Sequence, residues 1–362
     1  MPQIPVENLD KDSVLAWLLE NDETELNRLW QKADDVRRQC VGDDVWLRGL
    51  IEVSNNCARS CAYCGISLVA PRPKLYLMDK AEIMASAKKA LEYAYGTVVL
   101  QAGEDPRITG PWMADIVSCI KRETSLAITL SLGERSDEEL KMWREAGADR
   151  YLLRFETSDE KLYRQIHPDL GGPSNRIAQL ERMRDMGYEI GTGIMIGLPG
   201  QTWESMANDV WLFRKYGIDM VGVGPFLESP ATPLAGELGK ALRASAGDSQ
   251  VPSDDLTALK VVALTRLLCP DTNIPATTAL ATIDPTGGRI HGLQRGANVV
   301  MPNVTPAEYR SLYQTYPGKA GTHESADVSR HKIESQVLSL GRTIGKGPGT
   351  SLKYLQGKTS EH

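Results

Sequence analysis

The chain has 362 residues, of which 41% are hydrophobic and 24% charged, a balance typical of a folded protein with a sizeable core. Its formal net charge of −6 gives no general attraction to nucleic acid or to anionic lipid. No stretch is apolar over the roughly 18 residues of a membrane helix, and the first residues lack the pattern of a secretion signal. We therefore expect a cytoplasmic protein with neither nucleic acid nor membrane as a partner.

The pattern of elements predicts an α/β fold. Amphipathic runs that follow two possible helix caps, Asp12 and Asp22, predict an N-terminal helical cap over residues 1–45. Eight β-rich runs come next, at residues 47–53, 97–101, 126–132, 150–156, 189–197, 219–224, 272–278 and 297–302. Helical patterns separate them, at residues 78–95, 111–123, 137–146, 175–186, 203–216 and 254–268. This alternation predicts a complete (βα)8 TIM-type barrel over residues 46–320, followed by a C-terminal extension over residues 321–362.

Two segments interrupt this alternation. Residues 226–255 form a long irregular segment after the sixth predicted strand, and such a loop at a barrel mouth predicts a lid or a pocket wall. The tail from Gly341 is rich in Gly, Lys, Thr and Ser, so we expect a loosely held end.

Three of the six cysteines, Cys57, Cys61 and Cys64, fall within eight residues directly after the first predicted strand. This clustering indicates a metal site in a reducing compartment, and we expect no structural disulfides. A loop with the spacing Cys-x3-Cys-x2-Cys can bind three irons of a 4Fe-4S cluster and leave the fourth iron open. That iron could chelate the amino and carboxylate groups of S-adenosylmethionine. A structural zinc site is the alternative, but no fourth Cys or His lies close in the sequence.

Polar residues at the ends of other predicted strands are candidates for the same site. Gly103 permits close approach to the backbone, and Arg154 and Glu156 share one strand face, where buried charges need partners. Arg154 could bind an anion and Glu156 the ribose or ammonium group of the cofactor, or the two could form a structural ion pair. Further candidates are Tyr63, Gln101, Glu104 and Met195, together with Arg176, Thr129, Thr277, Thr278 and Tyr309, each of the last five being weak by itself. We predict that His167, His323 and His331 are surface residues, because no histidine occurs in a metal-spaced pair.

With these residues in place, the chain resembles the FeFe-hydrogenase maturases of the HydE family, radical SAM enzymes related to biotin synthase and methylornithine synthase. The resemblance extends from about residue 35 to residue 320 and includes CARSCAYCGI, VVLQAGEDP, GLPGQT, NIPATTA and YRSLYQTYPGK. It implies reductive cleavage of S-adenosylmethionine to a 5'-deoxyadenosyl radical. The implied substrate is an iron precursor that carries carbon monoxide, cyanide and cysteine, and the radical would attack the cysteine sulfur.

The resemblance also implies roles for single residues and for partners. Tyr63, Gly103, Glu104, Glu156 and Arg176 match cofactor positions, whereas Gln101, Thr129, Arg154, Thr277, Thr278 and Tyr309 match positions that line the substrate cavity. A ferredoxin or flavodoxin would supply electrons, and other hydrogenase maturases would be partners. Phe155 stands where the family often has histidine, and the C-terminal segment lacks the cysteines of a second cluster. A methylornithine-type mutase, a sulfur-inserting synthase and a non-catalytic cluster carrier remain the alternatives.

Overall fold

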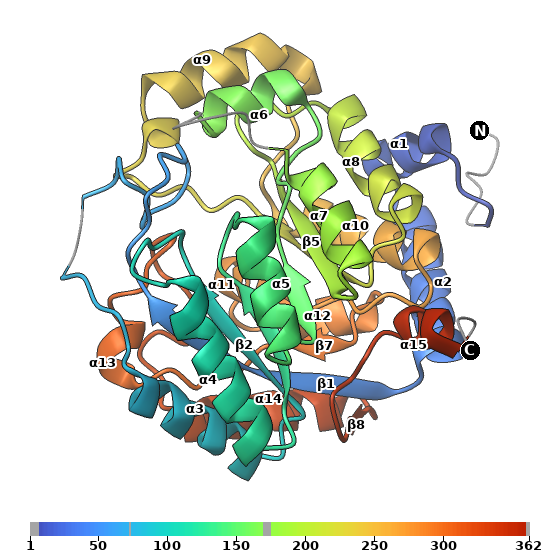
Figure 1. Cartoon of the computed structure of the whole chain (residues 1–362). Helices are drawn as coiled ribbons and strands as arrows, with labels where there is room; N and C mark the ends of the chain where they lie inside the picture. Colours follow the sequence, from blue (N-terminus) through green and yellow to red (C-terminus); the bar gives the residue numbers. More distant parts are fainter. Residues whose placement is uncertain (1–6, 72–73, 169–174, 360–362) are drawn as a thin grey trace.

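The computed structural model describes residues 7–71, 74–168 and 175–359. Its centre is a parallel sheet with the strand order β6-β5-β4-β3-β2-β1-β7 (Figure 1). The strands are β1 (Asp44–Ser54), β2 (Thr97–Ala102), β3 (Ala127–Ser131), β4 (Arg150–Leu152), β5 (Glu189–Ile196), β6 (Met220–Pro225) and β7 (Val299–Val300). A last short strand, β8 (Thr343–Ile344), also pairs with β1. All of these pairings are parallel, as the alternation of strands and helices predicts.

The sheet forms a half-barrel, so the prediction of a complete eight-stranded barrel is wrong. Residues 272–278 do not form a strand. They join the sheet through the isolated bridges Met220↔Asn273 and Pro275↔Val299, and the Thr277 hydroxyl donates 3.0 Å to the Val223 carbonyl. Pro275 has no N–H group to donate, which prevents a regular ladder through this segment. The fourth strand is also shorter than predicted, since the chain leaves it before Glu156, whose φ is +65°.

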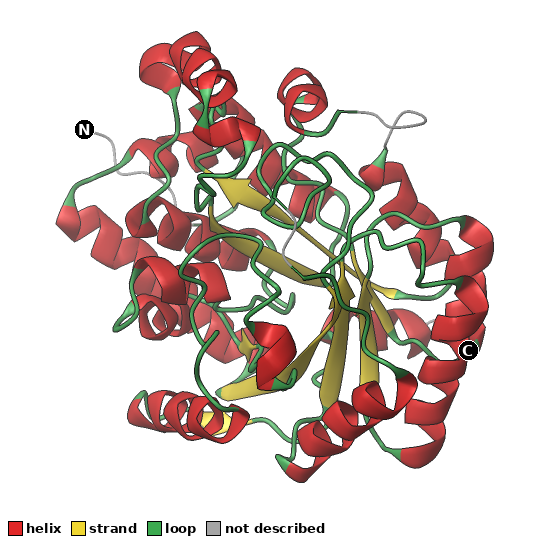
Figure 2. Ribbon diagram, turned by 90° about the vertical axis from the view of Figure 1, so that its left-hand side faces the viewer, coloured by secondary structure: helices red, strands yellow, loops and turns green. Residues whose placement is uncertain are grey.

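Helices surround the strands, and Figure 2 shows the sheet enclosed by them. Six helices lie where the sequence predicts them: α3 (Lys80–Glu92), α4 (Gly110–Glu123), α5 (Asp137–Glu145), α7 (Arg176–Asp185), α8 (Trp203–Lys215) and α10 (Asp255–Leu268). The others are α1 (Lys11–Leu19), α2 (Glu23–Val41), α6 (Glu160–Ile166), α9 (Glu237–Ala246), α11 (Thr278–Ile283), α12 (Gly288–Gln294), α13 (Ala307–Arg310), α14 (Ala326–Ser339) and α15 (Leu352–Thr359). Within the described ranges, none of these helices has the length and apolar character needed to cross a membrane.

The two N-terminal helices pack beside α8 and α10 (Figure 1). Asp22 caps α2 as predicted, whereas α1 is capped by Asp10 and not by Asp12. The buried Lys260 on α10 donates a hydrogen bond of 3.0 Å to the carbonyl of Leu18 at the end of α1. These helices are therefore anchored to the outer helix layer at α8 and α10.

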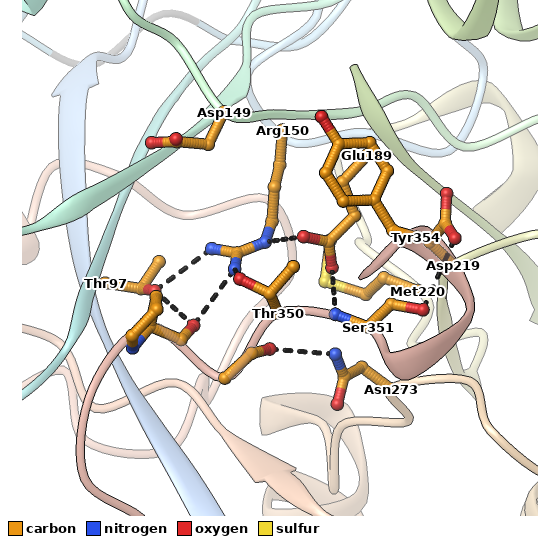
Figure 3. Close-up of polar contacts among 12 residues, drawn as sticks. Thr97, Asp149, Arg150, Glu189, Asp219, Met220, Asn273, Thr350, Ser351 and Tyr354 are labelled. Atoms are coloured by element: carbon orange, nitrogen blue, oxygen red, sulfur yellow. Dashed lines mark hydrogen bonds and ion pairs between the residues drawn. The ribbon is translucent and has the colours of Figure 1, made fainter. Parts of the chain in front are cut away.

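The C-terminal residues 343–351, which we call the C-terminal strap, close the amino-terminal end of the sheet, so the prediction of a loosely held tail is wrong. Arg150 and Glu189, which begin β4 and β5, form a buried ion pair of 2.5 Å, and the Glu189 carboxylate accepts a hydrogen bond from the Ser351 N–H at 3.0 Å. The Arg48 guanidinium donates to the Gly349 carbonyl at 3.0 Å. Figure 3 shows Arg150 and Glu189 beside Thr350 and Ser351 of the strap. Buried charges on the strands thus hold the tail through its backbone groups.

Candidate active site

A cavity of ≈ 330 Å³ lies at the carboxyl ends of the strands, where parallel barrels carry their catalytic groups. Most of the residues selected from the sequence line it: Cys57, Cys61, Tyr63, Cys64, Gln101, Gly103, Arg154, Glu156, Met195, Thr277 and Thr278. The irregular segment after β6 contributes Phe226 and Leu227, which confirms the predicted pocket wall. Its helix α9 lies beside α6 (Figure 1), and Leu242 of α9 shares one apolar cluster with Leu162 and Ile166 of α6. The cavity-lining residues named here come from six separate segments of the chain that meet at one mouth.

The cysteine loop follows β1 and is held close to the end of β2. Cys57 and Cys61 are buried, and Cys64 is half-buried. A Cβ atom on Gly103 would lie 2.5 Å from Cys57 Cβ and 3.0 Å from Cys57 Sγ, so only glycine permits this approach. Burial raises the pKa of the Cys64 thiol to about 12 and that of Cys61 further still. Thiols in such surroundings ionise only when a nearby metal stabilises the thiolate.

His167, at the end of α6, is part of this site, so the prediction that it is a surface residue is wrong; His323 and His331 are exposed as predicted. The His167 side chain is 3% exposed, and its Nε2 lies 3.2 Å from Cys61 Sγ and 2.8 Å from the Tyr63 hydroxyl. Burial lowers the pKa of His167 to about 2, with help from nearby arginines, so the ring is neutral. No metal-type spacing marks this residue in the sequence, because its partners lie about a hundred residues earlier.

Arg154 and Glu156 form the charged part of the cavity wall. An Arg154 Nη atom lies 3.2 Å from a Glu156 carboxylate oxygen and also donates 2.5 Å to the Ile194 carbonyl. The Arg154 Nε is buried and has no hydrogen-bond partner within the described ranges. A Cβ on Gly193 would lie 3.3 Å from that Nε and would collide with the Gly222 carbonyl at 1.9 Å. Gly193 on β5 thus makes room for a guanidinium that can still bind an anion.

Glu104 and Arg176 do not line the cavity but join an ionic network beside the cysteine loop. Arg59 lies 2.6 Å from one Glu104 oxygen and 3.3 Å from Glu134, which in turn accepts 2.9 Å from Arg176 Nε. Arg176 also donates 2.8 Å to the Arg154 carbonyl. The network therefore ties the cysteine loop to β4 and α7.

Two other predicted residues lie away from the cavity wall. Thr129 is fully buried on β3, one inward position below the cavity-lining Ser131, and its hydroxyl has no hydrogen-bond partner in the described part of the chain. Tyr309 donates 2.5 Å to Glu82 on α3, and its ring packs 4.6 Å from that of Tyr76. Neither side chain reaches the cavity in this arrangement.

The segment that follows Tyr309 supplies three cavity residues that were not predicted from the sequence. Tyr313, Tyr316 and Lys319 line the cavity. Gln101 donates 3.2 Å to the Tyr313 hydroxyl, and the Lys319 ammonium pairs with the fully buried carboxylate of Glu52 on β1. The motif YRSLYQTYPGK indicated that a tyrosine of this segment lines the cavity. It has three tyrosines within eight residues, and the sequence does not show which of them faces inward.

Comparisons with known proteins decide the family. Residues 51–210 match the model of the Radical SAM superfamily. The chain is 44% identical over 321 residues to the [FeFe] hydrogenase maturase subunit HydE of Thermotoga maritima, covering 89% of this chain and 88% of that protein. The chain belongs to the HydE family of radical SAM enzymes.

The chain is also similar, at lower identity, to methylornithine synthases. The chain is 30% identical to the 3-methylornithine synthase of Methanosarcina acetivorans, over 83% of this chain and 81% of that protein. The crystal structure of methylornithine synthase (PylB) superposes with a TM-score of 0.77 at 23% identity, covering 97% and 96% of the two chains. The similarity to the PylB structure, at 23% identity, supports the fold alone.

Family membership confirms the predicted cofactors, a 4Fe-4S cluster and S-adenosylmethionine, and it sets aside the zinc site and the non-catalytic carrier. The residues present fit these groups, because three thiols from one loop face a cavity that also holds Arg154 and Glu156. Within the described ranges, no three His, Cys, Asp or Glu side chains are placed to share a single metal ion. All six cysteines are free thiols.

Proposed function

We propose that this enzyme acts in FeFe-hydrogenase maturation on a small anionic iron complex that carries carbon monoxide, cyanide and cysteine. The observation that supports this substrate is the Arg154 guanidinium, which faces the cavity below the cysteine loop and keeps one N–H group unused. A cysteine carboxylate or a metal-bound cyanide would complete its hydrogen bonds. The relationship to a protein named a hydrogenase maturase supports the same assignment.

The chain's own residues would position the reactants and exclude water. When bound, the cluster and S-adenosylmethionine supply a 5'-deoxyadenosyl radical. We infer that Glu156 holds the ammonium or ribose group of the cofactor, while Arg154 and Gln101 orient the substrate. The rest of the wall is largely apolar, with Leu50, Leu152, Ile66, Phe226, Leu227 and Met301 facing the same space. Such a lining keeps a reactive radical away from solvent.

Phe155 does not weaken this assignment. Its ring is 3% exposed and packs 5.8 Å from the ring of Phe213 on α8, on the outer side of the sheet. Phenylalanine in place of histidine at this position therefore affects the packing against α8 and changes no side chain that faces the cavity.

A methylornithine-type rearrangement is the second candidate, because a relative with that name covers most of the chain. Arg154 and Glu156 could hold the carboxylate and ammonium groups of an amino acid equally well. The two candidates differ in the substrate that is consumed, which the experiment below measures directly.

The proposal includes a domain organisation, a source of electrons and a cellular setting. Residues 46–320 would form the catalytic unit, with residues 1–45 and 321–362 as additions. A ferredoxin or flavodoxin would reduce the cluster in the cytoplasm, other hydrogenase maturases would be partners, and neither nucleic acid nor membrane would take part.

The decisive experiment uses protein reconstituted anaerobically with iron and sulfide. Reduced enzyme with S-adenosylmethionine should consume a synthetic iron-carbonyl-cyanide-cysteine complex, followed by the infrared bands of its diatomic ligands, and should form 5'-deoxyadenosine. Cys57→Ala should abolish both reactions, whereas Cys119→Ala, at a buried cysteine on α4, should retain them. Arg154→Ala should slow substrate consumption more than it lowers the cluster content. Rearrangement of an amino acid with no effect on the iron complex would refute the proposed substrate.

A further inference from the structure

A second cavity, of ≈ 160 Å³, lies directly behind one wall of the reaction cavity. It is enclosed by α11, the segment after β7, the loop of residues 318–321 and the helix α14. Four residues, Leu50, Thr278, Met301 and Lys319, line both cavities. A single layer of side chains therefore separates the two spaces.

Lys319 is the movable part of this partition. Its ammonium pairs with the buried carboxylate of Glu52 and lies 4.8 Å from the centre of the ring of Tyr313, which lines the reaction cavity. Gly318 and Gly321 on either side have φ values of +66° and +80°. A lysine side chain has four rotatable bonds, so its ammonium can exchange between carboxylate partners without a change in the fold.

The wall of the second cavity carries an excess of positive charge. Lys319, Arg289 and Lys332 line it together with one carboxylate, that of Glu324, which lies 3.1 Å from Lys332. Arg289 on α12 donates 3.1 Å to the amide oxygen of Gln336, a neutral group. Its Nε is buried with no hydrogen-bond partner, and in the described part of the chain no carboxylate forms an ion pair with it. A half-buried guanidinium whose buried Nε–H has no acceptor is stabilised by an anion.

We propose that this second cavity is an anion-binding antechamber of the reaction cavity. A small anionic ligand that carries carboxylate or cyanide groups binds to Arg289 there and passes Lys319 on its way to the reaction cavity. No bond is made or broken in this step. The identity of the anion rests on the proposed function, whereas the site itself rests on the shared wall and on the charge of Arg289.

Two substitutions, one in α12 and one directly after it, distinguish anion binding in the second cavity from a general effect of losing a positive charge. Arg289→Gln removes the guanidinium in the cavity. Arg295→Gln is the matched control, because Arg295 follows the end of α12 and stacks on Trp30, 4.6 Å from the ring centre and away from the cavity. Lys332→Gln is a second test that does not depend on a buried residue, since the Lys332 side chain is 45% exposed.

The first measurement is iodide binding in crystals of the full-length protein, located by anomalous scattering. We expect iodide at Arg289 in the wild type and in the Arg295→Gln variant, and none in Arg289→Gln. The second measurement compares steady-state turnover of the synthetic iron complex with a single turnover of complex bound beforehand. Arg289→Gln should raise KM about tenfold, the effect of one lost charge-assisted contact, and leave the single turnover unchanged. Lys332→Gln should raise KM to a smaller extent.

Each contrary outcome has a defined meaning. Iodide at Arg289 with an unchanged KM in both cavity variants would identify an adventitious ion only and would overturn the antechamber. Equal losses in Arg289→Gln and Arg295→Gln would also overturn it. If the wild type consumes no iron complex at all, the proposed function fails, and iodide binding then decides the anion site by itself.

Discussion

Gly103→Ala is the sharpest test of how the cysteine loop is positioned. The added Cβ would lie 2.5 Å from Cys57 Cβ and 2.8 Å from the carbonyl oxygen of Asn56. Ordinary contact begins at 3.4 Å, so the loop must retreat by about 0.9 Å, the difference between 3.4 and 2.5 Å. The Asn56 oxygen is a backbone atom and Cys57 Cβ is bonded directly to the backbone, so no side-chain rotation relieves the collision. Overpacking of this kind costs about 1–3 kcal/mol, and functional sites tolerate only about 0.5 Å.

We therefore expect Gly103→Ala to fold but to bind the cluster poorly. Iron and sulfide per chain, the EPR signal of the reduced cluster and the yield of 5'-deoxyadenosine should all fall well below the wild-type values, while circular dichroism shows a folded chain. Gly236→Ala is the matched control, because a Cβ there meets its nearest neighbour at 3.5 Å and φ is −103°. Full cluster loading and normal cofactor cleavage by Gly103→Ala would refute the reasoning.

Three further predictions concern the groups that support the site. Glu189→Gln should lower the free energy of unfolding by about 3–5 kcal/mol, because the buried Arg150 loses its carboxylate; an unchanged urea midpoint would contradict this. His167→Phe should lower the midpoint potential of the cluster, since a hydrogen-bonding nitrogen 3.2 Å from Cys61 Sγ is lost. A potential and an EPR spectrum equal to those of the wild type would reject that role. Burial raises the pKa of Asp209 from 3.8 to about 7, so the folded chain binds this proton more tightly than the unfolded chain does. The free energy of unfolding therefore falls as the pH rises from about 4 to about 7. Asp209→Asn should remove this fall, and a stability profile that declines as in the wild type would show that another group causes it.

The sequence predicted the features that depend on local spacing. The positions of six helices and of most strands follow from hydrophobic periodicity and from caps, which act within a few residues. The three cysteines could be identified for the same reason, because one loop supplies them all. The incomplete barrel could also have been anticipated, since Pro275 stands in the middle of the predicted seventh strand.

Tertiary structure alone decided the rest. The contact between His167 and Cys61 joins residues 106 positions apart, and nothing near His167 in the sequence indicates it. The choice among Tyr309, Tyr313 and Tyr316 depends on the path of one loop over the barrel mouth. The C-terminal strap is held largely through backbone groups, with hydroxyl contacts from Thr350 and Ser351. Hydroxyl side chains and backbone groups are common in any loop, so they could not reveal that buried charges on distant strands would hold this segment.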